Sequence, residues 1–202
     1  MKFPKRALFF DFHTMPANPD VGKGFAMDTI AERFAQIGAE YVVFPARCNL
    51  GTAYYHTKIG IQHPAMQRDL LTELAAACHR RGIGISAYIN AGLSHEEGLR
   101  HREWLILRQN GQTYTDPASS FFRQMCYNSG YGEHLVAMAA EAVQHCQVDG
   151  LFLDCIRTEP CLGLECLEAM DKAGMDWRDE EQLYAYNADK CLALTRRVAA
   201  AV

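Results

Sequence analysis

Asp154 is the first candidate for chemistry in this sequence, because it ends a short apolar run, Gly150-Leu151-Phe152-Leu153. Side chains alternate along a strand, so an inward-facing Asp154 shares its face with Phe152. Burial and neighbouring groups can tune the pKa of such a carboxylate, which can then attack or stabilise a cationic centre. The alternative is that Asp154 caps the following helix. We favour the catalytic role.

Asp11 and His13 form a second candidate pair, because residues two apart on a strand point to the same face. Three roles are open: ligands of a metal-dependent hydrolase, contacts to a polar substrate, or a structural hydrogen-bonded pair. A metal site needs further ligands at later strand ends, where the sequence instead offers Arg47 and Asn90. A cation beside a metal is unfavourable. We therefore favour substrate contact for His13 and predict neither a metal nor a cofactor.

Two loops are dense in aromatic and hydrogen-bonding side chains: residues 54–60, Tyr-Tyr-His-Thr-Lys-Ile-Gly, and residues 101–104, His-Arg-Glu-Trp. Sugars are bound by aromatic faces and polar side chains of this kind. The alternative is that Tyr55 and Trp104 only pack these loops onto the protein. Together with the strand ends, the loops provide the predicted carbohydrate-binding residues: His13, Arg47, His56, Tyr88, Asn90, Trp104 and Arg157.

Alternating strands and helices must position these side chains. Short apolar runs predict strands at residues 7–13, 39–47, 83–91 and 148–156. Apolar residues at helical spacing predict helices at 27–38, 65–81, 132–146, 163–173 and 180–202. The long segment 92–129 is irregular, with a short helix near 94–100, a turn at 110–111 and a possible short strand at 124–127. This alternation is typical of a parallel sheet with helical crossovers.

Two α/β architectures fit this order, an open doubly wound sheet and a (β/α)₈ TIM barrel. Open nucleotide-binding sheets usually carry a glycine-rich turn after the first strand, and this sequence has none there. Barrels place polar chemistry at the carboxyl ends of several strands, which is the pattern here. A barrel needs eight strands and about 250 residues. We therefore expect residues 1–202 to be one partial catalytic domain, the first half of a barrel, whose exposed edges favour self-association.

Composition limits the possible partners. The chain has 202 residues, of which 49% are hydrophobic and 22% charged, values that exclude wholesale disorder. Its net charge of −4 lacks the basic surplus of a nucleic-acid binder. No apolar run reaches the roughly 18 residues that a membrane span requires, and the first residues make a poor signal peptide. We expect a cytoplasmic protein that binds carbohydrate and contacts neither nucleic acid nor membrane.

The sequence contains eight cysteines, which we interpret as reduced thiols because no signal peptide is evident. The nearest approach to a metal-binding pattern is Cys155, Cys161 and Cys166. Their spacing is irregular and no nearby histidine completes a set. We therefore favour small buried hydrophobic residues over a structural zinc site.

The order of several short motifs resembles a known enzyme family. Residues 39–44 with the loop to His56-Thr57-Lys58, residues 69–74, residues 78–88 and the strand 148–154 are similar to stretches of family-29 α-L-fucosidases. The chain also resembles uncharacterised glycoside hydrolases related to these enzymes and to α-amylase-like barrels. The shared elements are the segment 101–104, Cys126-Tyr127-Asn128 and a cysteine-rich stretch after the aspartate strand. The resemblance spans about residues 6 to 190.

This resemblance implies a barrel glycosidase of the retaining kind, with Asp154 as nucleophile. A retaining enzyme needs a second carboxylic acid roughly 5 Å away, which in such families usually comes from a later strand or loop. Glu159 is the only local candidate for that acid, so we expect the chain to be inactive alone. The paired histidines of the fucosidase second-strand loop are replaced by Arg47-Cys48-Asn49, which argues against fucose specificity. A non-catalytic carbohydrate-binding barrel and the metal-dependent hydrolase remain the alternatives.

Overall fold

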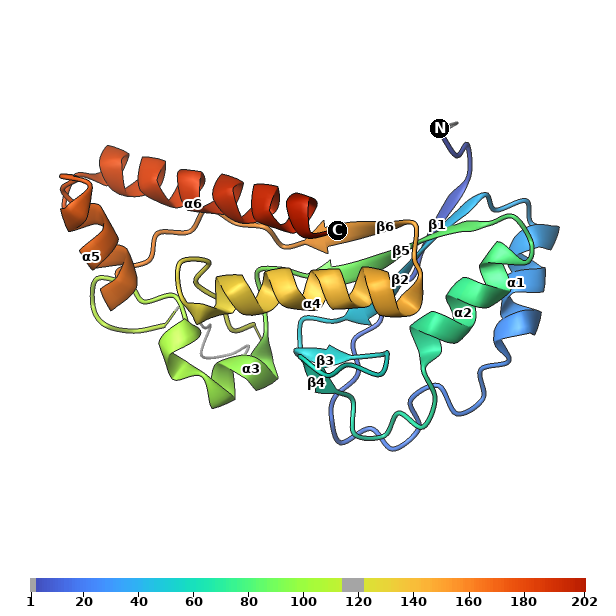
Figure 1. Ribbon diagram of the computed structural model, residues 1–202. Helices are drawn as coiled ribbons and strands as arrows, with labels where there is room; N and C mark the ends of the chain where they lie inside the picture. The colour runs from blue at the N-terminus through green and yellow to red at the C-terminus, as the bar shows by residue number, and fades with distance from the viewer. Residues whose placement is uncertain (1–2, 114–121) are drawn as a thin grey trace.

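The computed structural model describes residues 3–113 and 122–202, so part of the predicted irregular segment 92–129 lies outside the described residues. The chain alternates strands and helices in the predicted order (Figure 1). The strands are β1 Ala7–Phe9, β2 Tyr41–Arg47, β3 Thr52–Ala53, β4 Ile61–Gln62, β5 Gly84–Asn90 and β6 Gly150–Asp154. The helices are α1 Met27–Gln36, α2 Leu70–His79, α3 His95–Arg100, α4 Gly130–Cys146, α5 Leu164–Lys172 and α6 Glu180–Ala201, with a 3₁₀ turn at Arg102–Trp104.

A parallel sheet forms the centre of the molecule. β2 pairs in parallel with β1 on one side and with β5 on the other, and β5 pairs in parallel with β6. The spatial order β1-β2-β5-β6 therefore follows the chain, which is the arrangement of consecutive barrel strands. The short strands β3 and β4 extend the sheet from the carboxyl end of β2, where Arg47 pairs with Ala53.

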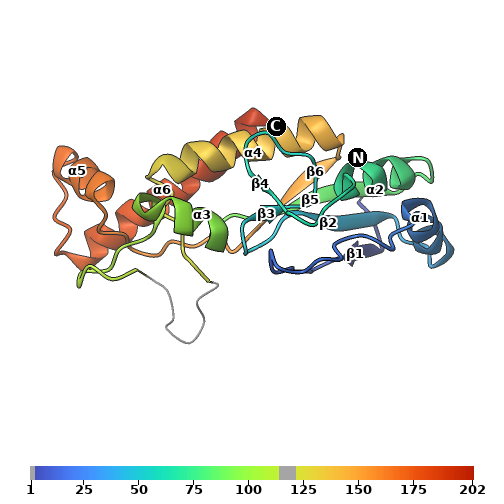
Figure 2. The ribbon, with the colours of Figure 1, turned by 90° about the horizontal axis from the view of Figure 1, so that it is seen from below.

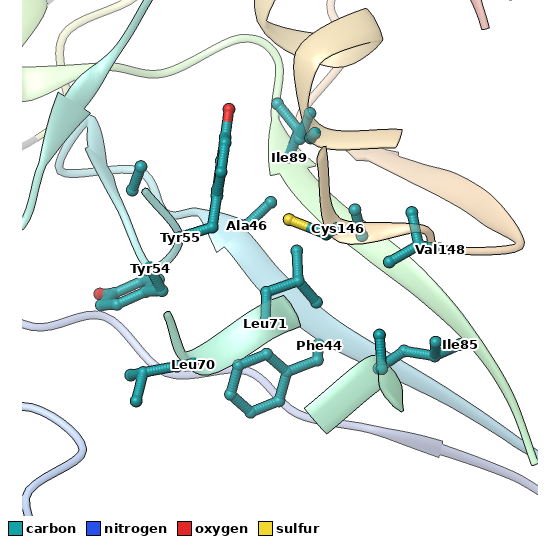
Figure 3. Close-up of a cluster of buried hydrophobic side chains, with 14 of the residues drawn as sticks. Phe44, Ala46, Tyr54, Tyr55, Leu70, Leu71, Ile85, Ile89, Cys146 and Val148 are labelled. Carbon is teal, nitrogen blue, oxygen red and sulfur yellow. The ribbon is translucent and has the colours of Figure 1, made fainter. Parts of the chain in front are cut away.

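Helices cover one face of this sheet (Figure 2). α2 and α4 pack on β5, while α6 runs along α4 and α1 packs against α2. Between the sheet and these helices lies the main hydrophobic core, which includes Phe44, Leu71, Ile85, Ile89 and Val148 (Figure 3). Burying these apolar side chains is the main favourable contribution to the stability of the sheet–helix layers.

The opposite face of the sheet is less covered. Phe9 and Phe152 are 49% and 42% exposed, and their rings lie 5.3 Å apart beside Tyr88. Leu151 and Leu153 instead pack against the main core. The predicted alternation along this strand is therefore confirmed, with Phe152 and Asp154 turned away from the helices.

Several element boundaries differ from the prediction. The first strand ends at Phe9, so Asp11 and His13 follow it in an irregular segment. α2 starts at Leu70 because the Asp69 side chain caps it, with Oδ1 accepting from the Thr72 N–H at 2.9 Å. Residues 48–64, predicted to be a loop, contain β3 and β4. Segment 124–127 forms only isolated bridges, from Gln124 to Leu93 and from Met125 to Leu105.

A second, smaller apolar cluster lies around α5 and the start of α6. Its buried members are Ile106, Cys126, Cys161, Cys166, Met170 and Tyr186. We call this region the cysteine lobe. Among the described residues, no helix is long and apolar enough to cross a membrane.

Candidate active site at the strand ends

Asp154 lies beside two polar residues of the neighbouring strand. The register of β5 and β6 pairs Asn90 with Asp154 and Tyr88 with Phe152. The Tyr88 hydroxyl donates to Asp154 Oδ2 at 2.6 Å, and Asn90 Nδ2 lies 3.2 Å from the Tyr88 oxygen and 3.4 Å from Asp154 Oδ2. Tyr88 and Asn90 are almost completely buried, whereas Asp154 is partly exposed. Parallel pairing thus builds a supported carboxylate at the sheet edge.

The environment of Asp154 favours its ionised form. Partial burial raises the pKa of this carboxyl, but hydrogen bonds from the Tyr88 hydroxyl and the Cys155 backbone outweigh burial, so its pKa is lowered. Cys155, at a φ of 53°, turns the chain immediately after the strand. Asp154 is therefore a carboxylate at neutral pH, the state that a nucleophile or an electrostatic stabiliser requires.

His13 lies close to the same strand ends. His13 Nε2 pairs with Asp11 Oδ1 at 2.8 Å, as expected for a hydrogen-bonded pair. A hydrogen bond with Cys48 raises the pKa of His13, burial opposes this, and the charges of Asp11 and Asp154 raise it further. The protonated form of His13 is therefore favoured beside the carboxylates of Asp11 and Asp154.

Cys48 is a part of this region to which the sequence analysis gave no role, and it contacts Tyr54 of the predicted aromatic loop 54–60. The Tyr54 hydroxyl lies 3.3 Å from Cys48 Sγ and 2.6 Å from Thr14 Oγ1. Burial raises the pKa of the Cys48 thiol, but hydrogen bonds from His13 and Tyr54 prevail and lower it to about 7. A lone cysteine gives no signal in a sequence; only the fold brings it to His13.

Arg47 occupies a different position from the one expected of a substrate contact. Its side chain is fully buried, with Nη1 donating to the Asn90 carbonyl and Nη2 paired with Glu97 Oε2. Glu97 also contacts His134 Nε2 at 2.7 Å and Ser94 Oγ at 2.8 Å. Burial raises the pKa of Glu97, but the charge of Arg47 together with the contacts to His134 and Ser94 outweighs burial and lowers the pKa to about 2. Arg47 thus supports the backbone of Asn90 and anchors α3.

His56 and Trp104 are held by contacts of their own. His56 is exposed, and its Nδ1 lies 3.0 Å from Gln62 Oε1 of β4. Trp104 stacks on His101, with ring centroids 3.8 Å apart, and lies 5.2 Å from the His134 ring of α4. Within the described parts of the chain, no hydrogen bond or ring contact joins either side chain to Asp154. The structure therefore does not gather these two residues with the strand-end group.

Arg157 and Glu159 line a small pocket on the loop after β6. Their side chains lie 3.9 Å apart, from Arg157 Nη1 to Glu159 Oε1. The pocket, of about 20 Å³, is also bordered by Tyr127, Cys126 and Cys161. Among residues 3–113 and 122–202, Glu159 makes no hydrogen bond or ion pair with Asp154. Its assignment as the acid stays a prediction.

Within residues 3–113 and 122–202, no third histidine, cysteine or carboxylate joins Asp11 and His13 in a group that could hold a metal ion. Within the described ranges, the single group of three histidine, cysteine or carboxylate side chains close enough to share a metal ion is Cys126, Cys161 and Cys166. Cys155, which the sequence grouped with Cys161 and Cys166, instead contacts Asp154 and Asn90. Metal-binding potential therefore lies in the cysteine lobe.

Consecutive parallel strands with helical crossovers and a supported carboxylate at their carboxyl ends are the architecture of a (β/α)-barrel. The family model described as hypothetical glycosyl hydrolase 6 matches residues 26–155. The chain belongs to this family. No curated protein matches the sequence significantly.

Solved structures agree with this assignment. α-L-Fucosidase isoenzyme 2 from Paenibacillus thiaminolyticus is similar over 98% of this chain, with a TM-score of 0.89 and 24% identity. The noncanonic maltogenic α-amylase AmyB from Thermotoga neapolitana is similar over 84%, with a TM-score of 0.53 and 14% identity. The chain spans 30% of the fucosidase and 43% of the amylase. The predicted fold class, part of a TIM barrel, is confirmed.

A third similar structure is that of a hypothetical protein. A hypothetical protein from Ruminiclostridium thermocellum matches 65% of this chain and 70% of its own, with a TM-score of 0.55 and 16% identity. At these identities the likeness shows the fold alone, so the roles of individual residues must rest on the site geometry.

Proposed function

We propose that this chain carries the nucleophile of a retaining glycoside hydrolase and that Asp154 is that nucleophile. The observation that supports this best is the hydrogen bond from the Tyr88 hydroxyl to Asp154 at the carboxyl end of β6. This bond and the Cys155 backbone keep the carboxylate ionised while it stays partly exposed. Asp154 would attack the anomeric carbon through an oxocarbenium-like transition state.

The second carboxylic acid of the mechanism has to protonate the leaving oxygen. Retaining enzymes hold the two carboxyl groups roughly 5–5.5 Å apart. Glu159 is the candidate within this chain, but it lies in the pocket beside Arg157 and Cys161. We therefore expect a segment other than these 202 residues to supply the acid, and the chain to be inactive alone.

His13 and Asn90 are the proposed contacts to sugar hydroxyls, because Asn90 ends β5 beside Asp154 and His13 lies near the same carboxylate. An α-L-fucoside is the first substrate to test, since a similar structure is an α-L-fucosidase. Arg47, which stands where the resemblance expects histidine, is buried in its ion pair with Glu97. We therefore propose a sugar site that differs from that of a fucosidase at β2.

A carbohydrate-binding protein without turnover is the second candidate. It is favoured by one observation: in the described part of the chain, no second carboxylate contacts Asp154. Binding of a sugar without hydrolysis by the longest form of the protein would support this candidate over the enzyme.

Self-association through the sheet edges is part of the same proposal. In the described chain β1 and β6 each pair on one side only, and Phe9 and Phe152 are exposed between them. Unpaired edges beside exposed aromatic rings favour association. We also propose a cytoplasmic location, because all eight cysteines are free thiols.

Hydrolysis of aryl glycosides, an α-L-fucoside among them, tests the enzyme proposal. In a protein that turns over one of these substrates, Asp154→Asn should reduce kcat by at least about 10⁴-fold, because the residue that forms the covalent intermediate is lost. Asp149→Asn, at the opposite end of the same strand, is the matched control and should retain activity. Retention of most activity by Asp154→Asn would contradict the nucleophile assignment.

A further inference from the structure

Three cysteines from separate segments meet in the cysteine lobe. Cys126 precedes α4, Cys161 lies on the loop after β6, and Cys166 lies in the first turns of α5. Their sulfur atoms all lie within 4.8 Å of one another, and those of Cys126 and Cys166 are 3.4 Å apart. All three side chains are buried.

Hydrogen-bond donors surround these sulfur atoms. The Gly163 N–H donates to Cys161 Sγ at 3.4 Å, from two residues further along the chain. The backbone of Asn128, again two residues on, makes a hydrogen bond to Cys126. Such N–H···S contacts stabilise negative charge on sulfur, so they suit thiolate ligands better than neutral thiols.

A buried hydroxyl beside the cluster supports the same conclusion. Tyr186 is 5% exposed, and its hydroxyl contacts Cys166, with no other hydrogen-bond partner in the described structure. A thiolate at Cys166 accepts a hydrogen bond from this buried hydroxyl better than a neutral thiol does.

We propose that Cys126, Cys161 and Cys166 bind one zinc ion as thiolates. Thiolates select zinc among the common divalent metals, and a tetrahedral site with Zn–S bonds of about 2.3 Å places the sulfur atoms roughly 3.8 Å apart. The observed separations, all within 4.8 Å, require only small movements. Binding releases the thiol protons to solvent.

A pocket that Cys126 and Cys161 border together with Glu159 leaves room for a fourth ligand. Its volume of about 20 Å³ suits one water molecule. A zinc-bound solvent molecule completes the tetrahedron there.

The zinc ion joins segments that have little other support. The lobe has a small apolar core compared with the one under the sheet. Small cores usually need a metal or a disulfide to hold their loops. Cys161 lies on the loop between β6 and α5, after Arg157 and Glu159. A zinc ion bound to Cys161 therefore restrains the loop that follows Asp154.

Metal analysis of the full chain, purified under reducing conditions without chelator, tests this site. We expect about one zinc per chain, and we expect cobalt in place of zinc to give the intense sulfur-to-cobalt charge-transfer absorption of a thiolate site. Cys126→Ser should weaken zinc binding at least about 100-fold. Cys155→Ser is the control, because the spacing along the sequence grouped Cys155 with Cys161 and Cys166 but the fold does not. It should leave the zinc stoichiometry and the zinc affinity unchanged.

Three results would overturn the proposal. The first is that the reduced chain, in which a thiol reagent titrates all eight cysteines, binds no zinc at micromolar zinc concentration. The second is Cys126→Ser that stays folded and binds zinc as the unaltered chain does. The third is a Cys126–Cys166 disulfide in freshly isolated protein. Because Cys126→Ser could unfold the lobe, the cobalt absorption of the unaltered chain provides an independent readout.

Discussion

The strand ends and the cysteine lobe bring reactive side chains together by different means. At the strand ends, the register of β5 and β6 sets Tyr88 and Asn90 beside Asp154, over the larger of the two cores. In the lobe, Cys126 and Cys161 come from irregular segments and meet Cys166 of α5 over a small core. Strand register is a local and repeating property, whereas the meeting of loops depends on the whole fold.

This difference predicts how far the effect of a mutation or of metal removal spreads from each region. The strand-end group rests on buried ion pairs and backbone pairing inside the cooperative sheet. The lobe rests on a few apolar contacts and, in our proposal, on a metal ion. Perturbing the first region should affect the whole molecule, and perturbing the second should act locally.

The largest effect on stability should come from Arg47→Met. This change leaves Glu97 buried without its cation, which costs roughly 3–5 kcal/mol of unfolding free energy. Urea denaturation followed by circular dichroism measures it. The double variant Arg47→Met/Glu97→Leu should recover much of the loss. Arg80→Met, which removes an exposed pair with Asp28, is the control and should cost far less than Arg47→Met.

Zinc removal should produce the next largest effect, confined to the lobe. Free zinc at about 100 times its Kd stabilises the region that binds it by about 2.7 kcal/mol, so chelation should speed amide exchange there about 100-fold. Hydrogen exchange read by mass spectrometry should show this in α5 and in residues 155–163. Equal acceleration in β5 would contradict the division into two regions.

Tyr88→Phe should lower activity by roughly 10- to 100-fold, since a hydrogen bond to a charged group contributes about 1.5–3 kcal/mol. Without the Tyr88 hydroxyl the pKa of Asp154 rises. The acidic limb of the kcat/KM profile, where activity disappears as Asp154 becomes protonated, should therefore move to higher pH. Tyr41→Phe is the control, because it removes a hydroxyl that contacts Ser86 at the far end of the sheet. It should change neither the activity nor the acidic limb of the kcat/KM profile.

The smallest effect should be a change in the titration of His13. Cys48→Ala removes the main cause of its raised pKa, so the pKa should fall toward 6.5 in an NMR titration. A raised pKa stabilises the folded state below the unfolded pKa, and this stabilisation disappears as pH rises through the folded value. The part of the folding stability that comes from protonated His13 should therefore be lost from Cys48→Ala, and this loss should be present at acidic pH and absent at high pH. Cys78→Ala, a buried thiol of α2, should leave His13 unchanged.

The sequence predicted the parts of the fold that depend on local periodicity. The apolar runs ending at Arg47, Asn90 and Asp154 form the expected parallel strands, and the alternation of Phe152 with Leu151 places Asp154 on the uncovered face. The families that these motifs resemble have the same fold. Hydrophobic patterning and strand register suffice for this level of prediction.

The partners of single polar residues could not be predicted in the same way. Arg47 ends a strand between apolar neighbours, which fits a substrate contact and a buried ion pair equally well. Which of the two forms depends on the position of Glu97 in α3, 50 residues further along the chain. Cys126 replaces Cys155 in the thiol cluster because the turn after β6 directs Cys155 toward Asp154. Spacing along the chain contains no information on such long-range contacts.

The central claim is that Asp154 is the nucleophile, and trapping the covalent intermediate tests it most directly. A form of the protein that hydrolyses a glycoside is incubated with the corresponding 2-deoxy-2-fluoro sugar bearing a good leaving group, digested and analysed by mass spectrometry. We predict one sugar attached to Asp154, and none in Asp154→Asn. A label on another carboxylate, or turnover with inversion and no label, would contradict the account.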